Sequence, residues 1–194
     1  LQGMYSASKH AVKAFTESLR MELQKEEAPI SVTLIKPAAI DTMFAVHARN
    51  YMEKEAALPA PVYAPDIVAK AILHCARHPK REVYVGGASK LVSAGHAHMP
   101  RLLDRYVRAT MFSQQKSKFD KMPGRPDALH APDPSNALRE RQGMTERSVK
   151  ETSAYTTLSL NAKPLWTALL GGGALFAAWK LARPQMARRR LGHL

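Results

Sequence analysis

Apolar residues recur at helical spacing near the start of the chain. Over residues 4–26, apolar side chains follow one another at intervals of four residues: Ala11, Phe15, Leu19 and Leu23. The charged residues of this segment fall largely on the other faces: Lys13, Glu17, Arg20 and Glu22. The pattern predicts an amphipathic helix, and Pro29 blocks its continuation.

Four further segments show regular patterns. The tripeptide Ala64-Pro65-Asp66 opens a second helix, because Pro suits the first turn and Asp lies near the positive end of the helix dipole. Its apolar residues share one face: Ile67, Val68, Ala71, Ile72 and Cys75. Residues 101–112 predict a third helix. The β-branched runs at residues 30–35 and 82–85 predict strands, the first covered on both faces as in a parallel sheet.

The order helix, strand, helix, strand, helix is typical of an α/β fold, which we place in residues 1–112. Residues 113–163 are rich in proline and polar side chains and contain few large apolar ones, so we expect a linker or extended arm. Residues 164–194 contain the most apolar run of the chain and a basic end. They predict a hydrophobic helix with a basic tail.

Composition and charge narrow the class of protein. The 194 residues are 45% hydrophobic, which excludes wholesale disorder and a polytopic membrane protein, and the single cysteine excludes an intramolecular disulfide framework. The net charge of +13 is unevenly distributed: residues 1–112 hold fifteen basic and ten acidic side chains, whereas residues 164–194 hold five basic and no acidic ones. Because this basic segment also contains the apolar run, we expect a membrane surface as partner and no nucleic acid.

The apolar run itself covers residues 165–179, 15 residues, which is shorter than the ~20 of a membrane-spanning helix. Trp166 and Trp179 stand at its ends as in an aromatic belt, and residues 188–190 are arginines that suit anionic lipid. We expect attachment to the cytoplasmic face of a membrane, and an interfacial or re-entrant anchor fits better than a single span. The alternative is a helix that packs on the α/β domain or on a partner subunit.

His96 and His98 are the side chains most similar to a pair of metal ligands. No carboxylate or further histidine follows at helical spacing, and the chain has no H-E-x-x-H motif. We therefore predict structural or surface histidines and no metal site.

One motif carries chemistry. Residues 5–9 are Y-S-A-S-K, and a spacing of four places Tyr5 and Lys9 on one face of the predicted helix. An ammonium beside a phenol stabilises the phenolate, so such a tyrosine can exchange a proton with a carbonyl or alcohol oxygen as general acid or base. Taken alone, such a pair is also common on solvated helix faces.

The motif continues as Y-S-A-S-K-H-A-V and F-T-E-S-L-R-M-E-L, followed by I-S-V-T-L-I-K-P-A-A-I-D-T. These segments resemble the active-site helix, and the strand and loop after it, of the short-chain dehydrogenase/reductase family. The resemblance extends over roughly residues 1–110 and implies part of a Rossmann-like, doubly wound parallel sheet. It implies that Tyr5 is the catalytic acid/base, and that Lys9 lowers the pKa of this tyrosine and holds the nicotinamide ribose.

The resemblance also implies a cofactor, NAD or NADP, between which the sequence does not distinguish. In the family, the turn after the strand contacts the nicotinamide carboxamide and nearby phosphates. The matching residues here are Pro37, Ile40 and Thr42, and Ala38 stands where the family commonly has glycine. The implied reaction is hydride transfer between the nicotinamide and a carbonyl or alcohol carbon.

Residues 43–63 correspond to the family's substrate-covering region, and we expect a long loop with a short helix. Its apolar side chains predict a lid over a small apolar carbonyl or alcohol: Met43, Phe44, Tyr51, Met52 and Leu58. The equal alternative is that these residues pack on the core.

The family places a glycine-rich strand–turn–helix, a Ser and an Asn before its tyrosine, and four residues precede Tyr5 here. We therefore expect the chain to be the C-terminal part of an oxidoreductase that by itself reduces no ketone with NADH or NADPH. The alternative is a non-catalytic module for membrane tethering or dimerisation. The reading frame upstream of Leu1 discriminates between the two, and a homodimer stays open under both.

Overall fold

The computed structural model describes residues 2–125, 127–132, 139–141 and 147–162. Almost all of them belong to one compact unit, Leu1–Leu160. The helices of this part are α1 (Gly3–Lys25), α2 (Phe44–His47), α3 (Pro65–Arg77), α4 (Gly87–His98), α5 (Pro100–Gln114) and α6 (Ala154–Asn161). Its strands are β1 (Leu34–Pro37), β2 (Ala39–Ile40), β3 (Lys54–Ala56), β4 (Val62–Tyr63), β5 (Glu82–Val85), β6 (Lys116–Asp120) and β7 (Val149–Lys150). The α/β class predicted from the sequence is confirmed.

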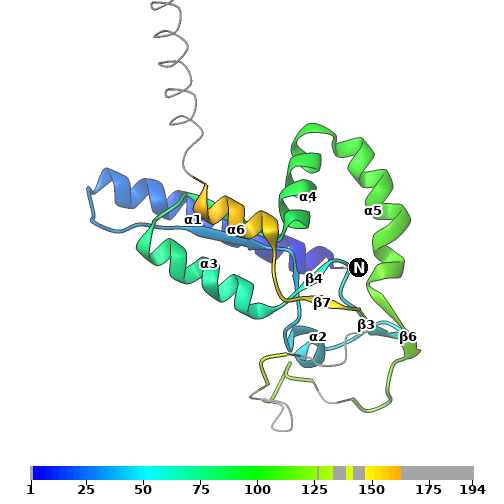
Figure 1. Ribbon diagram of the computed structural model, residues 1–194. Coiled ribbons are helices and arrows are strands. Elements are labelled where there is room, and N and C mark those ends of the chain that lie inside the picture. Colours follow the sequence, from blue (N-terminus) through cyan, green and yellow to red (C-terminus); the bar gives the residue numbers. More distant parts are fainter. Residues whose placement is uncertain (1, 126, 133–138, 142–146, 163–194) are drawn as a thin grey trace, which may run out of the picture. The chain divides into compact units, whose positions relative to one another are not determined.

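Parallel strand pairs form the centre of this unit. β1 pairs with β5 in parallel, with Ile35 opposite Val83, and α3 lies in the connection between the two strands. α1 and α3 lie on opposite sides of this pair (Figure 1). β4 pairs in parallel with both β2 and β7, whereas β3 and β6 are antiparallel. Parallel strands with helices on both sides are consistent with a Rossmann-like fold.

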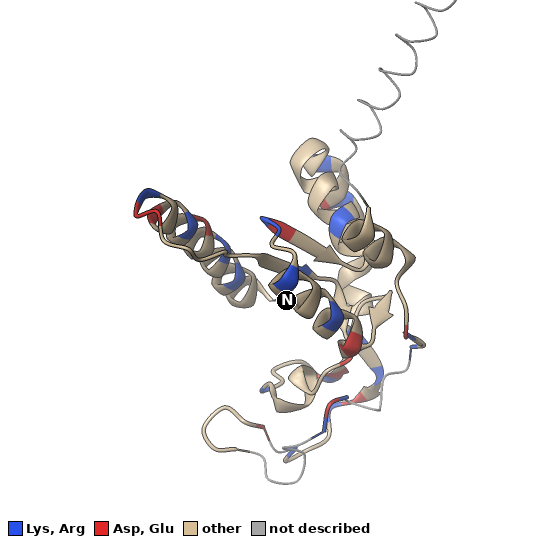
Figure 2. Ribbon diagram, turned by 60° about the vertical axis from the view of Figure 1, so that its left-hand side comes forward, with Lys and Arg blue, Asp and Glu red and all other residues tan. Residues whose placement is uncertain are grey.

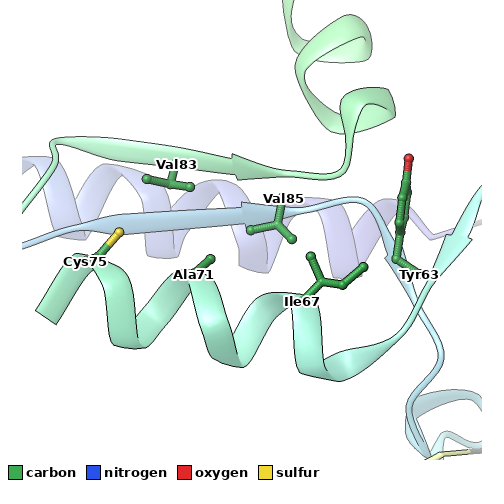
Figure 3. Close-up of a cluster of buried hydrophobic side chains, with 6 residues drawn as sticks. All are labelled: Tyr63, Ile67, Ala71, Cys75, Val83 and Val85. Carbon is green, nitrogen blue, oxygen red and sulfur yellow. The ribbon is translucent and has the colours of Figure 1, made fainter. Parts of the chain in front are cut away.

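The core lies between α3 and the β1–β5 pair (Figure 3). Its buried side chains are Tyr63, Ile67, Ala71, Cys75, Val83 and Val85. Ala71 and Val85 are fully buried, so α3 approaches the strands closely at this point. Burying a valine or isoleucine side chain contributes about 1.5–3 kcal/mol, so this face holds α3 on the sheet. Of the predicted apolar face of α3, Ile72 is the exception and is half exposed.

Local signals set the ends of α1 and α3. α3 begins with Pro65 in its first turn and Asp66 beside it, and it ends before Pro79, as predicted. At the end of α1, Glu27 adopts a left-handed φ of 53°. The N–H of Ala28 then donates to the carbonyl of Leu23 over 3.0 Å, which is the bond that closes a Schellman cap.

The exposed side of α1 differs from the prediction. Arg20, expected on a polar face, is 8% exposed and is the most buried side chain of the helix. Its guanidinium donates to the carbonyl oxygens of Val32 (3.2 Å) and Arg81 (3.1 Å), which anchors α1 to the segments that lead into β1 and β5. Phe15, expected on the apolar face, is 67% exposed, and the neighbouring Val12 is 52% exposed, because no described element covers that side of α1.

Residues 113–163, expected to form an irregular arm, contain regular structure in their described part. β6 pairs with β3, β7 pairs with β4, and α6 packs beside the core through the half-buried Leu160. Thr156 of α6 is 3% exposed and accepts a hydrogen bond from the N–H of Gly86 over 2.9 Å. Polar side chains and backbone pairing therefore hold this segment, which explains its low content of large apolar residues.

No helix among the described residues is both long enough and apolar enough to cross a membrane. The hydrophobic helix predicted for residues 164–194 lies outside the described residues. In the described part, acidic and basic residues are interspersed along the elements, and both signs occur at the C-terminal end of α1 (Figure 2).

Candidate active site

The predicted Tyr–Lys pair lies at the start of α1, as its spacing requires. Tyr5 is in the first turn and is 43% exposed, and the Lys9 ammonium lies 5.3 Å from the centre of the Tyr5 ring. Ser8 donates a hydrogen bond to the carbonyl of Tyr5 over 2.7 Å. Lys9 is exposed and has no carboxylate partner among the described residues, so its ammonium is available to other acceptors.

The turn after β1 comes back to this pair. Phe44 begins α2, and its ring lies 5.3 Å from that of Tyr5, centre to centre, at an interplanar angle of 46°. Thr42 is half-buried, and its hydroxyl accepts a hydrogen bond from the N–H of Phe44. The N–H of Thr42 donates to the carbonyl of Ile40 over 2.9 Å, which tightens the turn. The Phe44 ring, which follows the turn that contains Ile40 and Thr42, is therefore the observed contact between this segment and Tyr5.

Pro37 lies farther back in this segment. It is the last residue of β1, opposite Val85 of β5, and it is exposed. The next N–H, that of Ala38, donates to the carbonyl of Val85 over 2.8 Å. Ala38 also lies 3.0 Å from the position that a Cβ would take on Gly86, so the turn passes close to the end of β5.

Asp41 is a residue that sequence reasoning did not single out. Its side chain is 2% exposed, and its Oδ1 has no hydrogen-bond partner among the described residues. The Asp41 N–H donates to the carbonyl of Tyr63 over 2.9 Å, which extends the β2–β4 pairing into the turn. A buried carboxylate in this position is unusual, and its signal in the sequence was weak because one aspartate in a turn is common.

The five predicted substrate-loop residues differ in exposure, and Leu58 is intermediate. Met43 is 5% exposed and belongs to the core, as the alternative reading proposed for such residues. Phe44 is 49% exposed and Tyr51 82% exposed, and Met52 is intermediate. Phe44 is the member of this set that contacts Tyr5, so it is the side chain best placed to meet a substrate there.

A second residue that the sequence did not reveal lies behind this loop. Arg125 donates hydrogen bonds to the carbonyl oxygens of Ala45, Val46 and Ala48 and to the carboxylate of Glu55. Backbone carbonyls are partners that any sequence offers, so no local pattern marks this arginine. A polar hollow of about 210 Å³ lies next to Arg125 and is lined by Ala48, Arg49, Asn50, Lys121, Gly124, Arg125 and Asp127. Neither Tyr5 nor Lys9 belongs to its wall.

The residues at Tyr5 fit one end of a nicotinamide cofactor. The Lys9 ammonium, which has no carboxylate partner among the described residues, and the Thr42 hydroxyl are donors of the kind that ribose hydroxyls and a carboxamide accept, whereas the half-buried Ile40 packs against the hydrophobic core. No group of three or more His, Cys, Asp or Glu side chains in the described part lies close enough together to hold a metal ion.

Sequence comparison finds relatives of this chain among oxidoreductases. A family model described as short chain dehydrogenase matches residues 1–53. The chain is 36% identical to the uncharacterized oxidoreductase YxnA of Bacillus subtilis over 184 residues, which are 94% of this chain and 50% of that protein. It is 30% identical over 119 residues to the putative oxidoreductase SadH of Mycobacterium tuberculosis, covering 56% of this chain and 42% of that protein.

A human relative, dehydrogenase/reductase SDR family member 11, is 35% identical over 78 residues, which are 39% of this chain and 30% of that protein. No solved structure gives a significant match. The parallel α/β arrangement is consistent with a Rossmann-like fold, and the chain belongs to the short-chain dehydrogenase/reductase family. It spans half or less of the length of the curated relatives named here.

Proposed function

We propose that the full-length protein is an NAD(P)-dependent oxidoreductase that reduces an apolar carbonyl compound or oxidises the corresponding alcohol, with Tyr5 as acid and base. The observation that carries this proposal is the contact between Tyr5 and Phe44, because Phe44 lies two residues after Thr42 and its N–H donates to the Thr42 hydroxyl. A carbonyl oxygen near the Tyr5 hydroxyl then has an apolar ring on one side and the nicotinamide-contacting turn next to it.

The nicotinamide supplies the hydride for the carbonyl carbon when it is bound. Tyr5 donates its hydroxyl proton to the carbonyl oxygen, so that the C=O becomes an alcohol and the phenol becomes a phenolate. Solvent then returns a proton to the phenolate. Water reaches this side chain because Tyr5 is 43% exposed. In alcohol oxidation the same phenolate accepts the hydroxyl proton.

Lys9 supports this step in two ways. Its ammonium lies 5.3 Å from the Tyr5 ring and stabilises the phenolate through its positive charge. As an exposed donor without a carboxylate partner in the described part of the chain, it also holds ribose hydroxyls and so orients the cofactor.

The proposal predicts that Lys9→Met weakens cofactor binding. Removal of a charged hydrogen-bond donor costs about 1.5–3 kcal/mol, so we expect the Kd for NADH or NADPH to rise at least tenfold. A fluorescence titration of the full-length protein measures this. Lys13→Met is the matched control, because Lys13 lies one turn further along α1 and pairs with Glu17 at 3.2 Å. An unchanged Kd in Lys9→Met rejects this role for Lys9.

We further propose that residues 164–194 attach the protein to the cytoplasmic face of a membrane. Sequence supports this: the run of 15 uncharged residues ends in Trp179, and three consecutive arginines follow at 188–190. Apolar contact with the acyl region and attraction to anionic headgroups then act together.

Flotation with lipid vesicles tests this attachment. We expect the chain to float with vesicles that contain phosphatidylglycerol and to do so weakly with phosphatidylcholine alone. Phe176→Asp, inside the uncharged run, should abolish flotation, and replacing the three arginines with glutamine should reduce it. A chain that stays at the bottom of the gradient with anionic vesicles contradicts the proposal.

A further inference from the structure

The segment that follows α5, residues 116–125 and 127–128, runs alongside the substrate loop (residues 43–63). We call this segment the arm. β6 (Lys116–Asp120) pairs antiparallel with β3 (Lys54–Ala56) of the loop. Two hydrogen bonds continue the pairing on either side: the N–H of Ala57 donates to the carbonyl of Gln115 over 3.0 Å, and that of Lys121 to the carbonyl of Glu53 over 2.8 Å. The arm therefore adds a strand along the outer side of the substrate loop.

Arg125 is the point at which this arm meets α2. Its side chain is 17% exposed, and its guanidinium donates to Val46 (2.8 Å) and Ala48 (3.3 Å) and to the carbonyl of Ala45. These carbonyls lie in the last turn of α2 and just beyond it, where no intrahelical N–H remains to bond them. A cation is also favourable at this negative end of the helix dipole.

Glu55 of β3 fixes the position of this arginine. Its carboxylate pairs with the Arg125 guanidinium, and its second oxygen accepts the N–H of Met122 over 3.0 Å. Both side chains of the ion pair are mostly buried, at 17% and 22% exposure. The guanidinium therefore has a charge partner on the loop and carbonyl partners on α2, and it joins the two.

α2 depends on such contacts. It has four residues, and a helix of that length has no stability of its own in water. Its last carbonyls are bonded by Arg125, and the N–H of Ala128 donates to the carbonyl of His47 over 2.8 Å. Since α2 begins with Phe44, whose ring contacts Tyr5, the arm determines where that ring lies.

We propose that Arg125 is a positioning residue for the active site. It holds α2 in helical form, so that Phe44 makes a fixed apolar wall against Tyr5, and this wall binds the apolar part of the carbonyl substrate. The inference rests on the proposed oxidoreductase function for its substrate, but the hold of Arg125 on α2 is independent of that function. Lysine does not replace this arginine, because one ammonium does not reach the carbonyls and the Glu55 carboxylate in the planar geometry of a guanidinium.

Hydrogen–deuterium exchange of the 194-residue chain tests the structural half of the proposal. In Arg125→Gln we expect amide exchange in peptides that cover residues 44–57 to become at least tenfold faster, with unchanged exchange in α3 and β5. Arg125→Lys should give an intermediate acceleration. Arg141→Gln is the matched control, since Arg141 also pairs with a glutamate, Glu151, through two hydrogen bonds, and no contact within the described residues joins it to α2. Unchanged exchange over 44–57 in Arg125→Gln overturns the proposal, and so does an equal acceleration in α3 and β5.

Kinetics of the full-length protein test the functional half. Arg125→Gln should raise the KM for an apolar carbonyl substrate about tenfold, with a smaller change in kcat and an unchanged Kd for the cofactor. An unchanged KM overturns the role in substrate binding. If exchange accelerates as expected but Tyr5→Phe retains turnover, the proposed function fails while the hold of Arg125 on α2 stands. If exchange is unchanged and Tyr5→Phe is inactive, the positioning role fails and the proposed function stands.

Discussion

Lys36 and Glu82 form an ion pair between β1 and β5, on the side of the sheet that carries Tyr84. The Tyr84 hydroxyl donates to Glu82 over 3.2 Å and shares a 3.0 Å hydrogen bond with Ser93, and the Lys36 ammonium lies 4.9 Å from the Tyr84 ring centre. The hydrogen bond from Lys36 holds the pKa of Glu82 below its usual value of 4.5, against the opposing effect of burial. Burial lowers the pKa of Lys36, but its bonds to Glu82 and Tyr84 outweigh this and raise it above 10.5.

This pair predicts a pH dependence of stability. Because the pKa of Glu82 is lower in the folded state, its contribution is complete above about pH 4.5 and is lost as the pH falls through the folded pKa. Urea unfolding at pH 7 and pH 3 should therefore show Glu82→Gln less stable than wild type at pH 7, with the difference shrinking at pH 3. Glu17→Gln, in the exposed pair with Lys13, is the control and should show a smaller change. A Glu82→Gln difference that is equal at both pH values contradicts this assignment.

Asp41 and Arg125 are residues near the candidate site that could not be predicted from the sequence. Tyr5 and Lys9 are visible because their chemistry is local and their spacing places both on one helical face. Arg125 bonds carbonyls about 80 residues earlier in the chain, and a carbonyl has no sequence signature. Asp41 is distinguished by burial alone, which depends on how β2, β4 and β7 come together.

Among the elements, α6 is tied to the core at both of its ends. Near its start, Thr156 accepts the N–H of Gly86 and donates to Ser153, each over 2.9 Å. Near its end, the Lys80 ammonium donates to the carbonyls of Ser159 (2.8 Å) and Leu160 (3.0 Å), where a cation suits the helix dipole. These polar bonds fix α6 beside β5, even though few large apolar residues come from this part of the chain.

Thr156→Val should destabilise the unit. Valine keeps the volume of threonine but leaves the buried N–H of Gly86 without a partner, which costs about 1–3 kcal/mol. The free energy of unfolding from urea denaturation measures this loss. Thr152→Val is the control, because Thr152 is exposed and precedes the helix, and it should change stability by no more than about 0.5 kcal/mol. Equal stability of Thr156→Val and wild type contradicts the role of this bond.

The elements with complete local signals were predictable. α1, α3 and β5 have both a periodic pattern and a proline or glycine near an end, and their observed bounds lie within about two residues of the predicted ones.

β1 begins at Leu34, four residues later than predicted, because β5 offers four residues for pairing and so sets its length. α4 was missed because Gly87 and Gly95 and its small residues give no apolar stripe. The short strands β3, β6 and β7 depend on distant partners that no local window contains.

At the scale of the whole molecule, the candidate site is built from features that lie far apart in sequence. The Tyr–Lys pair opens α1, the turn with Ile40 and Thr42 follows β1, and the arm with Arg125 holds the loop from the other side. The positive charge of the chain bears on a different proposal, the attachment to a membrane. The net charge of +13 includes five basic side chains and no acidic one in residues 164–194, which supports the proposed membrane attachment.

The central claim is that Tyr5 transfers the proton in a nicotinamide-dependent reaction, and turnover of Tyr5→Phe in the full-length protein tests it most directly. Reduction of a panel of apolar ketones and aldehydes by NADH and NADPH should fall at least 100-fold in kcat, since general acid catalysis contributes about 10²–10⁴-fold, while the Kd for the cofactor stays unchanged. Tyr106→Phe, at an exposed position of α5, is the matched control and should retain wild-type turnover. Wild-type turnover by Tyr5→Phe, or no turnover of any of these carbonyls by the unsubstituted full-length protein, would contradict the account.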